Sequence, residues 1–497
     1  MRKILFSLLT LILLTNCTIA QKNETIIKGK IQGKIPKEII YTTLLNGTFS
    51  RNFNHKIKPN KNGEFDIKIS LETPSFIEIL IANKIAKSFV VENGKNYDLI
   101  LDFDAKDKNE QFKLYRNKER LLYQDFPLAG SARQASVAIG INKSISEIKR
   151  EISIQKNKKL KPFDLLLADK KINNELYHFI KMNTDIYFSA VAASVITTKF
   201  MRTNPKDFDK FPKETKQYWS TIFDENSILE TSFITSPFWV EYAKLYNDFK
   251  EYTAANFGIE KIMKMRELVK QGKIHSYFIE KASYNLPEFS LEFYTANYLL
   301  EELNKKRFEK ELLSLFASFK EKYPSSIYLE YLTSEIHQLK KFHKIKDEKE
   351  TKKISFIKNY QNKNTLKEIL KSFKGQRVYL DIWATWCGPC KEEFKHKKEL
   401  DSFLKANNIK LLYISIDDEN RNEQWKKMTE YYNLYGSHLR ANKKLIKELQ
   451  ILFNNNGTIE IPWYLLINEN GTIAKRKAKR PSQLIELKEE INKVFKS

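Results

Sequence analysis

Residues 381–394 read DIWATWCGPCKEEF, and two of the chain's three cysteines, Cys387 and Cys390, lie in this stretch. A cysteine pair separated by two residues serves as part of a metal site, as a structural disulfide or as a redox couple. A zinc site normally needs two further Cys or His ligands, and the sequence has no second such pair, so no metal and no cofactor are predicted. A disulfide across so short a loop constrains little of the unfolded chain. The pattern therefore favours redox chemistry.

The flanking residues place the pair between a strand and a helix. Residues 376–383 (QRVYLDIW) predict a buried strand, and residues 388–405 predict an amphipathic helix. The positive end of the helix dipole and its unsatisfied N–H groups would then lie at the Cys387 sulfur. They would stabilise the thiolate, which is the form that attacks disulfides. Cys390, one turn further on, would be shielded and would act as the resolving thiol.

An α/β pattern continues to the end of the chain. After the first strand and helix we expect a strand at 409–416, a helix at 423–433, strands at 462–468 and 471–477, and a closing helix. This order predicts a mixed sheet covered by helices over residues 355–497. Residues 419–460 are predicted to add a further helix and a rim that selects substrates.

Two further regions precede this domain. Residues 24–105 contain short alternating segments such as GEFDIKISL (63–71), separated by Asn-Gly turns, and predict a small antiparallel β-sandwich. Residues 110–345 have few glycines and an apolar spacing typical of a bundle of helical hairpins. The charged stretch 340–353 predicts a linker. The predicted fold class is therefore multidomain, with an all-β sandwich-like domain, an α-helical middle region and an α/β domain.

The beginning of the chain predicts export. MRK followed by ILFSLLTLILLT is typical of a bacterial signal peptide and is too short to span a bilayer. LTNC (14–17) resembles a lipobox, which would give a signal over 1–16 and a lipid anchor on Cys17, although Asn16 departs from that pattern. TIA followed by Gln21 fits an ordinary cleavage site and a signal over 1–20. Both alternatives place the mature chain in the periplasm or cell envelope, soluble or lipid-anchored.

The formal net charge of the chain is +25. Nucleic-acid-binding proteins typically gather positive charge in a patch or run, whereas the lysines here are spread evenly along the chain. The chain is also rich in Ile and Asn, which favours a genome-wide codon bias as the origin of its lysines. No nucleic-acid partner is predicted.

The run WATWCGPC (383–390) resembles the active-site motif of thioredoxin-fold proteins. With its CxxCxxE extension and the export signal, it resembles the TlpA/ResA-like thiol–disulfide oxidoreductases of bacterial envelopes. This resemblance covers residues 355–497 and implies a thioredoxin-like fold there. The β-rich start and helical middle resemble the long accessory regions that precede such domains in envelope proteins of Bacteroidetes-type bacteria.

The resemblance implies a role for several residues. Cys387 matches the attacking cysteine of the redox-active disulfide and Cys390 the resolving one, while Trp386 matches a residue of the contact surface. Asp381 matches the buried acid behind the disulfide in thioredoxin, and Glu393 matches the acid one turn after the second cysteine in the ResA-like branch. Either carboxyl group, if buried, should have a raised pKa and could exchange a proton with Cys390.

Three details qualify these roles. The many charged residues around Glu393 leave open a second interpretation, in which it lies on a solvated helix face. The strand LLYISI has no lysine to pair with Asp381, which departs from thioredoxin. In the family, a proline at the position of Pro462 is cis and lies against the disulfide, and the residue before it, here Ile461, offers its backbone to the substrate.

The resemblance implies an enzyme that reduces disulfides. Cys387 would attack a disulfide of an exported protein, and Cys390 would release the reduced product. The implied partners are disulfide-bearing envelope proteins and a membrane thiol electron donor, since the periplasm has no thiol buffer of its own. Two alternatives stay open: a disulfide isomerase or oxidase, and a partner- or polymer-binding envelope protein whose redox domain is ancillary. Peroxide reduction is disfavoured, because peroxidase relatives usually lack the second cysteine at this spacing.

Overall fold

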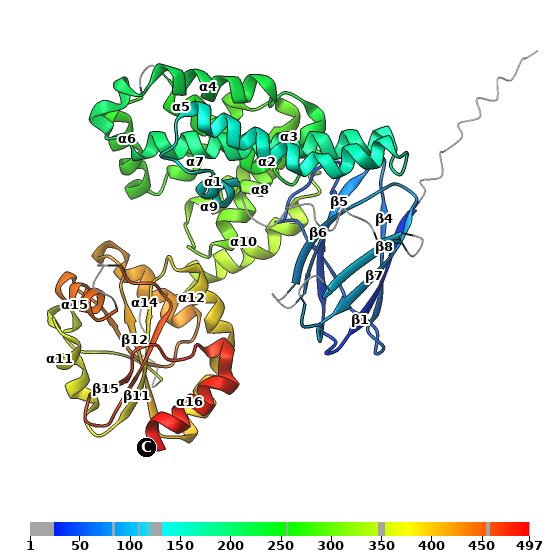
Figure 1. Cartoon of the computed structure of the whole chain (residues 1–497). Helices are drawn as coiled ribbons and strands as arrows, with labels where there is room; N and C mark the ends of the chain where they lie inside the picture. The colour runs from blue at the N-terminus through cyan, green and yellow to red at the C-terminus, as the bar shows by residue number, and fades with distance from the viewer. Residues whose placement is uncertain are drawn as a thin grey trace, which may run out of the picture. The chain divides into compact units, whose positions relative to one another are not determined.

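The computed structural model describes residues 24–81, 85–107, 110–116, 119–120, 132–254, 257–345, 353–453 and 458–496. The predicted signal peptide with Cys17 and most of the predicted linker lie outside these residues. The chain forms two compact units, Met1–Lys264 with Lys281–Leu291, and Met265–Glu280 with Glu292–Ser497. The predicted sequence of a β-rich region, a helical region and an α/β domain is confirmed (Figure 1).

The β-rich region of the first unit consists of two sheets, with strand orders β4-β1-β7-β8-β9 and β3-β2-β5-β6. The strands are β1 (Glu24–Gln32), β2 (Ile39–Thr42), β3 (His55–Ile57), β4 (Glu64–Ser70), β5 (Ser75–Ile81), β6 (Ile85–Val91), β7 (Asn96–Asp102), β8 (Phe112–Arg116) and β9 (Glu119–Arg120). Every second residue of β4 is buried, as its alternating sequence predicts. The rings of Phe89 on β6 and Phe112 on β8 lie 5.5 Å apart, so the two sheets share a core.

Two features of this region differ from the prediction. The predicted sandwich is antiparallel, but β1 pairs in parallel with β7. Helical structure is expected from about residue 110 onward, but β8 pairs with β7 and β9 extends the sheet to Arg120. The five residues of β8 bury Phe112 and Leu114 against the other sheet. A run this short carries too few positions for its period to be recognised in the sequence.

The helical region is shared between the two units. The first unit contains α1 (Ala132–Ile139), α2 (Ile145–Ala168), α3 (Asn174–Arg202), α4 (Lys213–Glu225) and α5 (Trp239–Tyr252). The helices α6 (Ile259–Gln271), α7 (Ile274–Asn285) and α8 (Glu288–Asn304) are divided between the units, and α9 (Glu311–Lys322) and α10 (Leu329–His343) belong to the second. Aromatic side chains form much of the core, since buried Trp219 packs on Phe200, Phe249 and Tyr252.

The α/β domain of the second unit is built on a six-stranded sheet of order β10-β13-β12-β11-β14-β15. Its strands are β10 (Ile354–Phe356), β11 (Arg377–Trp383), β12 (Ile409–Ser415), β13 (Gly436–Arg440), β14 (Trp463–Ile467) and β15 (Ile473–Lys475). Its helices are α11 (Leu366–Leu370), α12 (Gly388–Glu393), α13 (Lys397–Ala406), α14 (Asn422–Tyr431), α15 (Lys443–Phe453) and α16 (Leu484–Lys496). The first four strands of the sheet order are parallel, and β14 and β15 form an antiparallel hairpin.

The position of β11 explains its apolar sequence. It lies between β12 and β14, and every residue after Arg377 is buried. Strand β13 is not predicted, because its sequence GSHLR neither alternates nor forms an apolar run. The strand can pair with β12 because Gly436 has no side chain. Gly436, with φ +143°, approaches β12 so closely that a Cβ atom would lie 2.6 Å from the Leu411 carbonyl oxygen. The His438 ring on β13 then stacks on Tyr413 at 4.7 Å.

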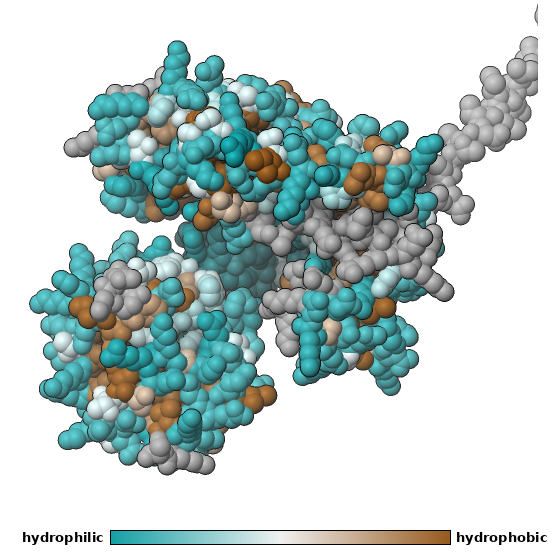
Figure 2. All heavy atoms as spheres, viewed as in Figure 1, coloured by the Kyte–Doolittle hydropathy of each residue, from teal (hydrophilic) through white to brown (hydrophobic). Residues whose placement is uncertain are grey.

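Hydrophilic side chains cover most of the face shown in Figure 2. In the part of the chain that the structure describes, no helix combines the length and the apolar character needed to cross a bilayer.

Candidate active site

Cys387 and Cys390 form a disulfide at the junction between β11 and α12. Cys387 is the N-cap of α12, and its sulfur accepts a hydrogen bond from the Cys390 backbone N–H at 3.1 Å. Pro389 occupies the first turn, where no N–H is needed. Cys387 is 4% exposed and Cys390 is 0% exposed, so the predicted shielding of the second sulfur is observed.

The loop that leads to Cys387 is fixed by a buried carboxylate at the end of β12. Asp417 accepts hydrogen bonds from the Thr385 backbone N–H at 2.8 Å and from the Thr385 hydroxyl at 2.7 Å. The Ser415 hydroxyl donates to the same carboxylate at 2.6 Å. All three residues are fully buried. Because charge-assisted hydrogen bonds are the strong ones in a protein interior, this group holds the loop in one conformation.

Lys391, the residue directly after the cysteine pair, points into the protein. It is 4% exposed, and its ammonium group donates to the carbonyl oxygens of Thr385 at 2.9 Å, Lys305 at 2.7 Å and Lys306 at 3.2 Å. These bonds join the active-site helix to the loop that follows α8. Burial lowers the pKa of Lys391 to about 8, with the neighbouring Arg307 as the next cause.

That loop, residues 305–308, belongs to the same compact unit as α12. Lys306 and Phe308 have φ values of +50° and +58°, a conformation that costs a residue other than glycine roughly 1–2 kcal/mol. Packing compensates for this cost, since the Phe308 ring stacks on Phe342 at 4.2 Å and contacts Tyr431 at 4.8 Å. The helical region therefore contributes backbone groups next to the cysteine pair.

Asp381 lies on β11 in a fully apolar stretch and is buried. Among the described residues, its Oδ1 atom has no hydrogen-bond partner. Burial raises the pKa of its carboxyl group well above the usual range, and the negative charge of Glu393 raises the pKa further. Its register partner on β12 is Tyr413, so an aromatic residue and not a lysine lies opposite it on that strand.

Glu393 is buried at the end of α12, so its charged neighbours do not indicate a solvated position. Its carboxylate accepts hydrogen bonds from the Ser482 backbone N–H at 2.8 Å and the Ser482 hydroxyl at 3.0 Å. An ion pair with Arg480 at 3.6 Å is also present. Glu393 therefore connects the active-site helix to the turn before α16, and its charge acts on Asp381.

The remaining predicted residues lie on the outer side of the site. Trp386 is 44% exposed. The Ile461–Pro462 peptide bond is cis, and both residues are half-buried. Pro462 directly precedes Trp463, which pairs with Ile382 at the end of β11 that leads to the cysteine pair. Cys17, the predicted lipidation site, lies outside the described residues.

Sequence reasoning missed two parts of this site, the Thr385–Asp417 pair and Lys391. The sequence shows Thr385 two residues before Cys387 and Asp417 just after the next strand. Adjacent parallel strands end at the same side of a sheet, so residues that directly follow them lie close together. Nothing comparable signalled Lys391, because two of its three partners are backbone carbonyl groups about 85 residues earlier in the chain.

Comparisons with known proteins agree with this geometry. Residues 335–490 match the family model described as Redoxin. The thiol-disulfide oxidoreductase ResA of Bacillus thuringiensis subsp. konkukian is 29% identical over 105 residues, which are 21% of this chain and 56% of that protein. The sporulation thiol-disulfide oxidoreductase A of Bacillus subtilis is 28% identical over 115 residues, covering 21% of this chain and 60% of that protein.

One solved structure is similar to part of the chain. A thiol-disulfide oxidoreductase from Bacteroides fragilis is 25% identical, and the match covers 24% of this chain and 83% of that chain with a TM-score of 0.20. The chain spans a little over half of the length of the first curated relative, since the match covers 56% of that protein. The predicted resemblance to ResA-like proteins with a large N-terminal extension is confirmed.

Proposed function

Since the C-terminal region is a Redoxin domain of the thioredoxin-like thiol–disulfide oxidoreductases, we propose that the whole protein reduces disulfides of exported proteins. The observation that carries the proposal is the Cys387–Cys390 disulfide at the start of α12, with the second sulfur fully shielded. Exposed Trp386 beside Cys387 offers an apolar surface to a partner.

The reaction is a pair of thiol–disulfide exchanges. The Cys387 thiolate attacks one sulfur of the client disulfide, a mixed disulfide forms, and the other client sulfur leaves as a thiolate. The Cys390 thiolate then attacks the Cys387 sulfur, which releases the second client thiolate and forms the Cys387–Cys390 disulfide. The client gains two electrons and the enzyme loses two. A buried carboxyl group in its charged carboxylate form, Asp381 or Glu393, takes the proton from Cys390 before the Cys390 sulfur attacks.

Each cycle leaves the enzyme oxidised, so a second thiol partner must return two electrons. We propose that the enzyme acts in the periplasm or cell envelope, where a membrane thiol electron donor supplies them. The export signal at the start of the sequence supports this compartment, and a lipid on Cys17 would anchor the chain there. The clients are envelope proteins that carry disulfides.

Insulin disulfide reduction by the full chain tests the activity. Replacement of the attacking thiol in Cys387→Ser should abolish the reduction, whereas Cys390→Ser should accumulate a mixed disulfide through Cys387. A double Cys387→Ser/Cys390→Ser variant is the background control. Full activity of Cys387→Ser would refute the proposal.

The direction of the reaction is tested by the reduction potential of the pair, measured by alkylation and mass spectrometry in graded thiol buffers. A value near about −270 mV supports a reductase. A value of about −120 to −180 mV would replace this proposal with the oxidase or isomerase alternative.

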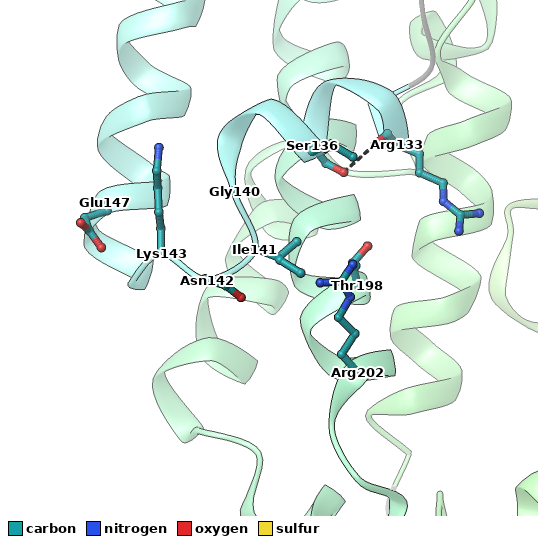
Figure 3. Close-up of a pocket in the computed structure, with 10 residues that line it drawn as sticks. Arg133, Ser136, Gly140, Ile141, Asn142, Lys143, Glu147, Thr198 and Arg202 are labelled. Carbon is teal, nitrogen blue, oxygen red and sulfur yellow. Dashed lines mark hydrogen bonds between the residues drawn. The ribbon is translucent and has the colours of Figure 1, made fainter. Parts of the chain in front are cut away.

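A cavity in the helical part of the first unit favours the second candidate function, partner binding. It has a volume of about 690 Å³, and Arg133 on α1, Lys143 before α2 and Arg202 on α3 are among its lining residues (Figure 3). Lys199 donates to the carbonyl oxygens of Ile141 at 2.5 Å and Lys143 at 2.8 Å, which fixes the turn at its edge. Three cationic side chains and one carboxylate, Glu147, line the cavity, and this excess of positive charge suits an acidic partner segment.

Binding of a fluorescent poly-glutamate peptide to the full chain tests this second function. Arg133→Gln/Arg202→Gln should weaken binding at physiological salt, and Lys210→Gln, an exposed lysine outside the cavity, should not. If Lys210→Gln weakened peptide binding as much as Arg133→Gln/Arg202→Gln, the binding would come from general charge attraction. That result would refute a binding site in the cavity.

A further inference from the structure

Three side chains with metal-ligating atoms meet in the second unit. His275 lies on α7, Glu302 lies on α8, and Glu309 lies between α8 and α9. One ligand atom from each of the three lies within 4.8 Å of the other two. His275 is only 4% exposed and Glu302 is also buried. The sequence predicts no metal site, because these residues follow no recognised spacing and come together only through the fold.

The neighbours of His275 fix the direction of its ring. Its Nδ1 atom lies 2.9 Å from the Tyr298 hydroxyl group, and its Nε2 atom lies 3.1 Å from Glu309 Oε2. In the described structure, neither Nε2 nor Glu309 Oε2 satisfies the geometry of a hydrogen bond. A ring held by a hydrogen bond at one nitrogen, with the other nitrogen directed at a carboxylate, has the orientation of metal-binding histidines.

Another carboxylate near the cluster has a separate task. Glu311 accepts hydrogen bonds from the backbone N–H groups of His275 at 3.0 Å and Ser276 at 2.7 Å, so it caps α7. It therefore positions the backbone of His275 and leaves the ring free to act with Glu302 and Glu309. Lys305 contacts one oxygen of Glu302 at 2.5 Å, and the second oxygen stays available.

We propose that His275, Glu302 and Glu309 bind one divalent transition-metal ion, with zinc as the best match. One imidazole and two carboxylates are a donor set that zinc uses at ligand distances of about 2.0–2.2 Å, with water in the fourth position. Tetrahedral geometry at those distances separates ligand atoms by about 3.3 Å. The His275–Glu309 pair is already close to this spacing at 3.1 Å, and the ligand atom of Glu302 lies within 4.8 Å of both.

The proposed metal would act on the loop beside the redox site. Glu302 and Glu309 stand at the two ends of the 305–308 loop, which accepts hydrogen bonds from Lys391. One ion bound to both would hold the ends of the loop together. The metal-site proposal does not depend on the proposed redox activity, because none of the metal ligands belongs to the cysteine pair.

Zinc binding to the full chain tests the proposal. Cys17→Ser and complete oxidation of the Cys387–Cys390 pair remove thiolates that would bind zinc on their own. Titration with zinc chloride by calorimetry should then give one bound zinc per chain. Glu309→Gln and Glu302→Gln preserve side-chain shape and should each weaken binding by roughly tenfold or more, as should His275→Gln. The matched control is His337→Gln, an exposed histidine on α10.

Hydrogen exchange gives a second measurement that does not depend on affinity alone. Zinc should slow exchange of the backbone amides over residues 302–309 in the parent chain and in His337→Gln, but not in Glu309→Gln. Circular dichroism of each variant without zinc checks that it is folded. The proposal is overturned if the parent chain does not bind zinc, or if the folded glutamine variants bind it as tightly as the parent. The second result would show that His275 and Glu309 form only an ion pair.

Discussion

The ammonium group of Lys391 lies 2.7 Å from the carbonyl oxygen of Lys305, 86 residues earlier in the chain. This contact joins the helix that carries the cysteine pair to a loop of the helical region. The two acceptors in the loop are the backbone carbonyl oxygens of Lys305 and Lys306. The contact therefore depends on the backbone conformation of the loop and not on the side chains of these two residues. It makes the 305–308 loop part of the environment of the redox site.

Removal of this contact should loosen the loop. Lys391→Met keeps the length of the side chain but removes the donor to three carbonyl groups, and buried unsatisfied groups typically cost about 1–3 kcal/mol. We expect a lower free energy of unfolding and faster hydrogen exchange at residues 305–308. Lys398→Met, at an exposed position on α13, should change neither. Unchanged exchange in Lys391→Met would show that other contacts hold the loop without Lys391, such as the packing of Phe308 and the bond between His343 and the Phe308 carbonyl oxygen.

Asp381 should make stability depend on pH. Its pKa is raised in the folded state by burial and by Glu393, so the folded protein favours the protonated carboxyl group. Below the unfolded pKa of about 3.9, both states are protonated and Asp381→Asn should resemble the parent chain. Above it, stability of the parent is progressively lost until the pH exceeds the folded pKa, whereas the variant has no such loss. The variant should therefore gain stability relative to the parent as the pH rises, by about 1.4 kcal/mol for each pH unit between the unfolded and the folded pKa of Asp381.

Denaturant unfolding at pH 4 and pH 8 measures this difference. Asp418→Asn, at an exposed aspartate after β12, is the matched control and should show no change with pH relative to the parent. A stability difference between Asp381→Asn and the parent that is the same at both pH values would contradict a protonated Asp381. In turnover above the folded pKa, where Asp381 carries its negative charge, Asp381→Asn should slow the step in which Cys390 attacks, since the variant cannot accept the Cys390 proton.

Glu393 should matter more for stability than for proton transfer. Its two oxygens are already occupied by Ser482 donors, whereas Asp381 has an unpartnered oxygen in the described structure. Glu393→Gln places an N–H₂ group against one of those donors, and we expect a loss of about 1–3 kcal/mol in unfolding free energy. Glu392→Gln, at the exposed neighbouring position, is the control. A large effect of Glu393→Gln on resolution of the mixed disulfide, with normal stability, would make Glu393 the proton acceptor instead.

Trp386 should affect protein substrates specifically. It is 44% exposed, so Trp386→Ala should change the unfolding free energy by less than about 0.5 kcal/mol. A buried aromatic anchor at an interface contributes about 1–2 kcal/mol or more, which corresponds to roughly a tenfold higher KM for insulin. A small aromatic disulfide should be reduced as fast as before. Ile485→Ala, which removes an exposed apolar side chain on α16, should leave both substrates unaffected, and an equal rise in KM there would refute a specific contact.

The parts of the structure that follow from local sequence were predictable. The apolar run of β11, the cysteine pair at the start of α12 and the Ile461–Pro462 step each carry their own signal, and the structure brings the last two to the end of β11, where Ile382 pairs with Trp463. The long amphipathic helices were predictable for the same reason. Their apolar spacing is a property of neighbouring residues.

The parts that depend on distant residues were not predictable. The burial of Lys391 depends on carbonyl groups of another region, and its charge alone indicates an exposed position. Strand β13 requires the close approach of Gly436 to β12, which no local pattern shows. The grouping of His275 with Glu302 and Glu309 exists only after three segments have packed.

The loop beside α12 bears on how such proteins can be recombined. The charged stretch 340–353 looks like a natural point at which to exchange one redox domain for another. A crossover there would separate α12 from the 305–308 loop and leave the Lys391 ammonium group without two of its acceptors. A successful chimera should instead carry the segment from Met265 onward, where the second compact unit begins, so that the loop and the cysteine pair are inherited together with the rest of that unit.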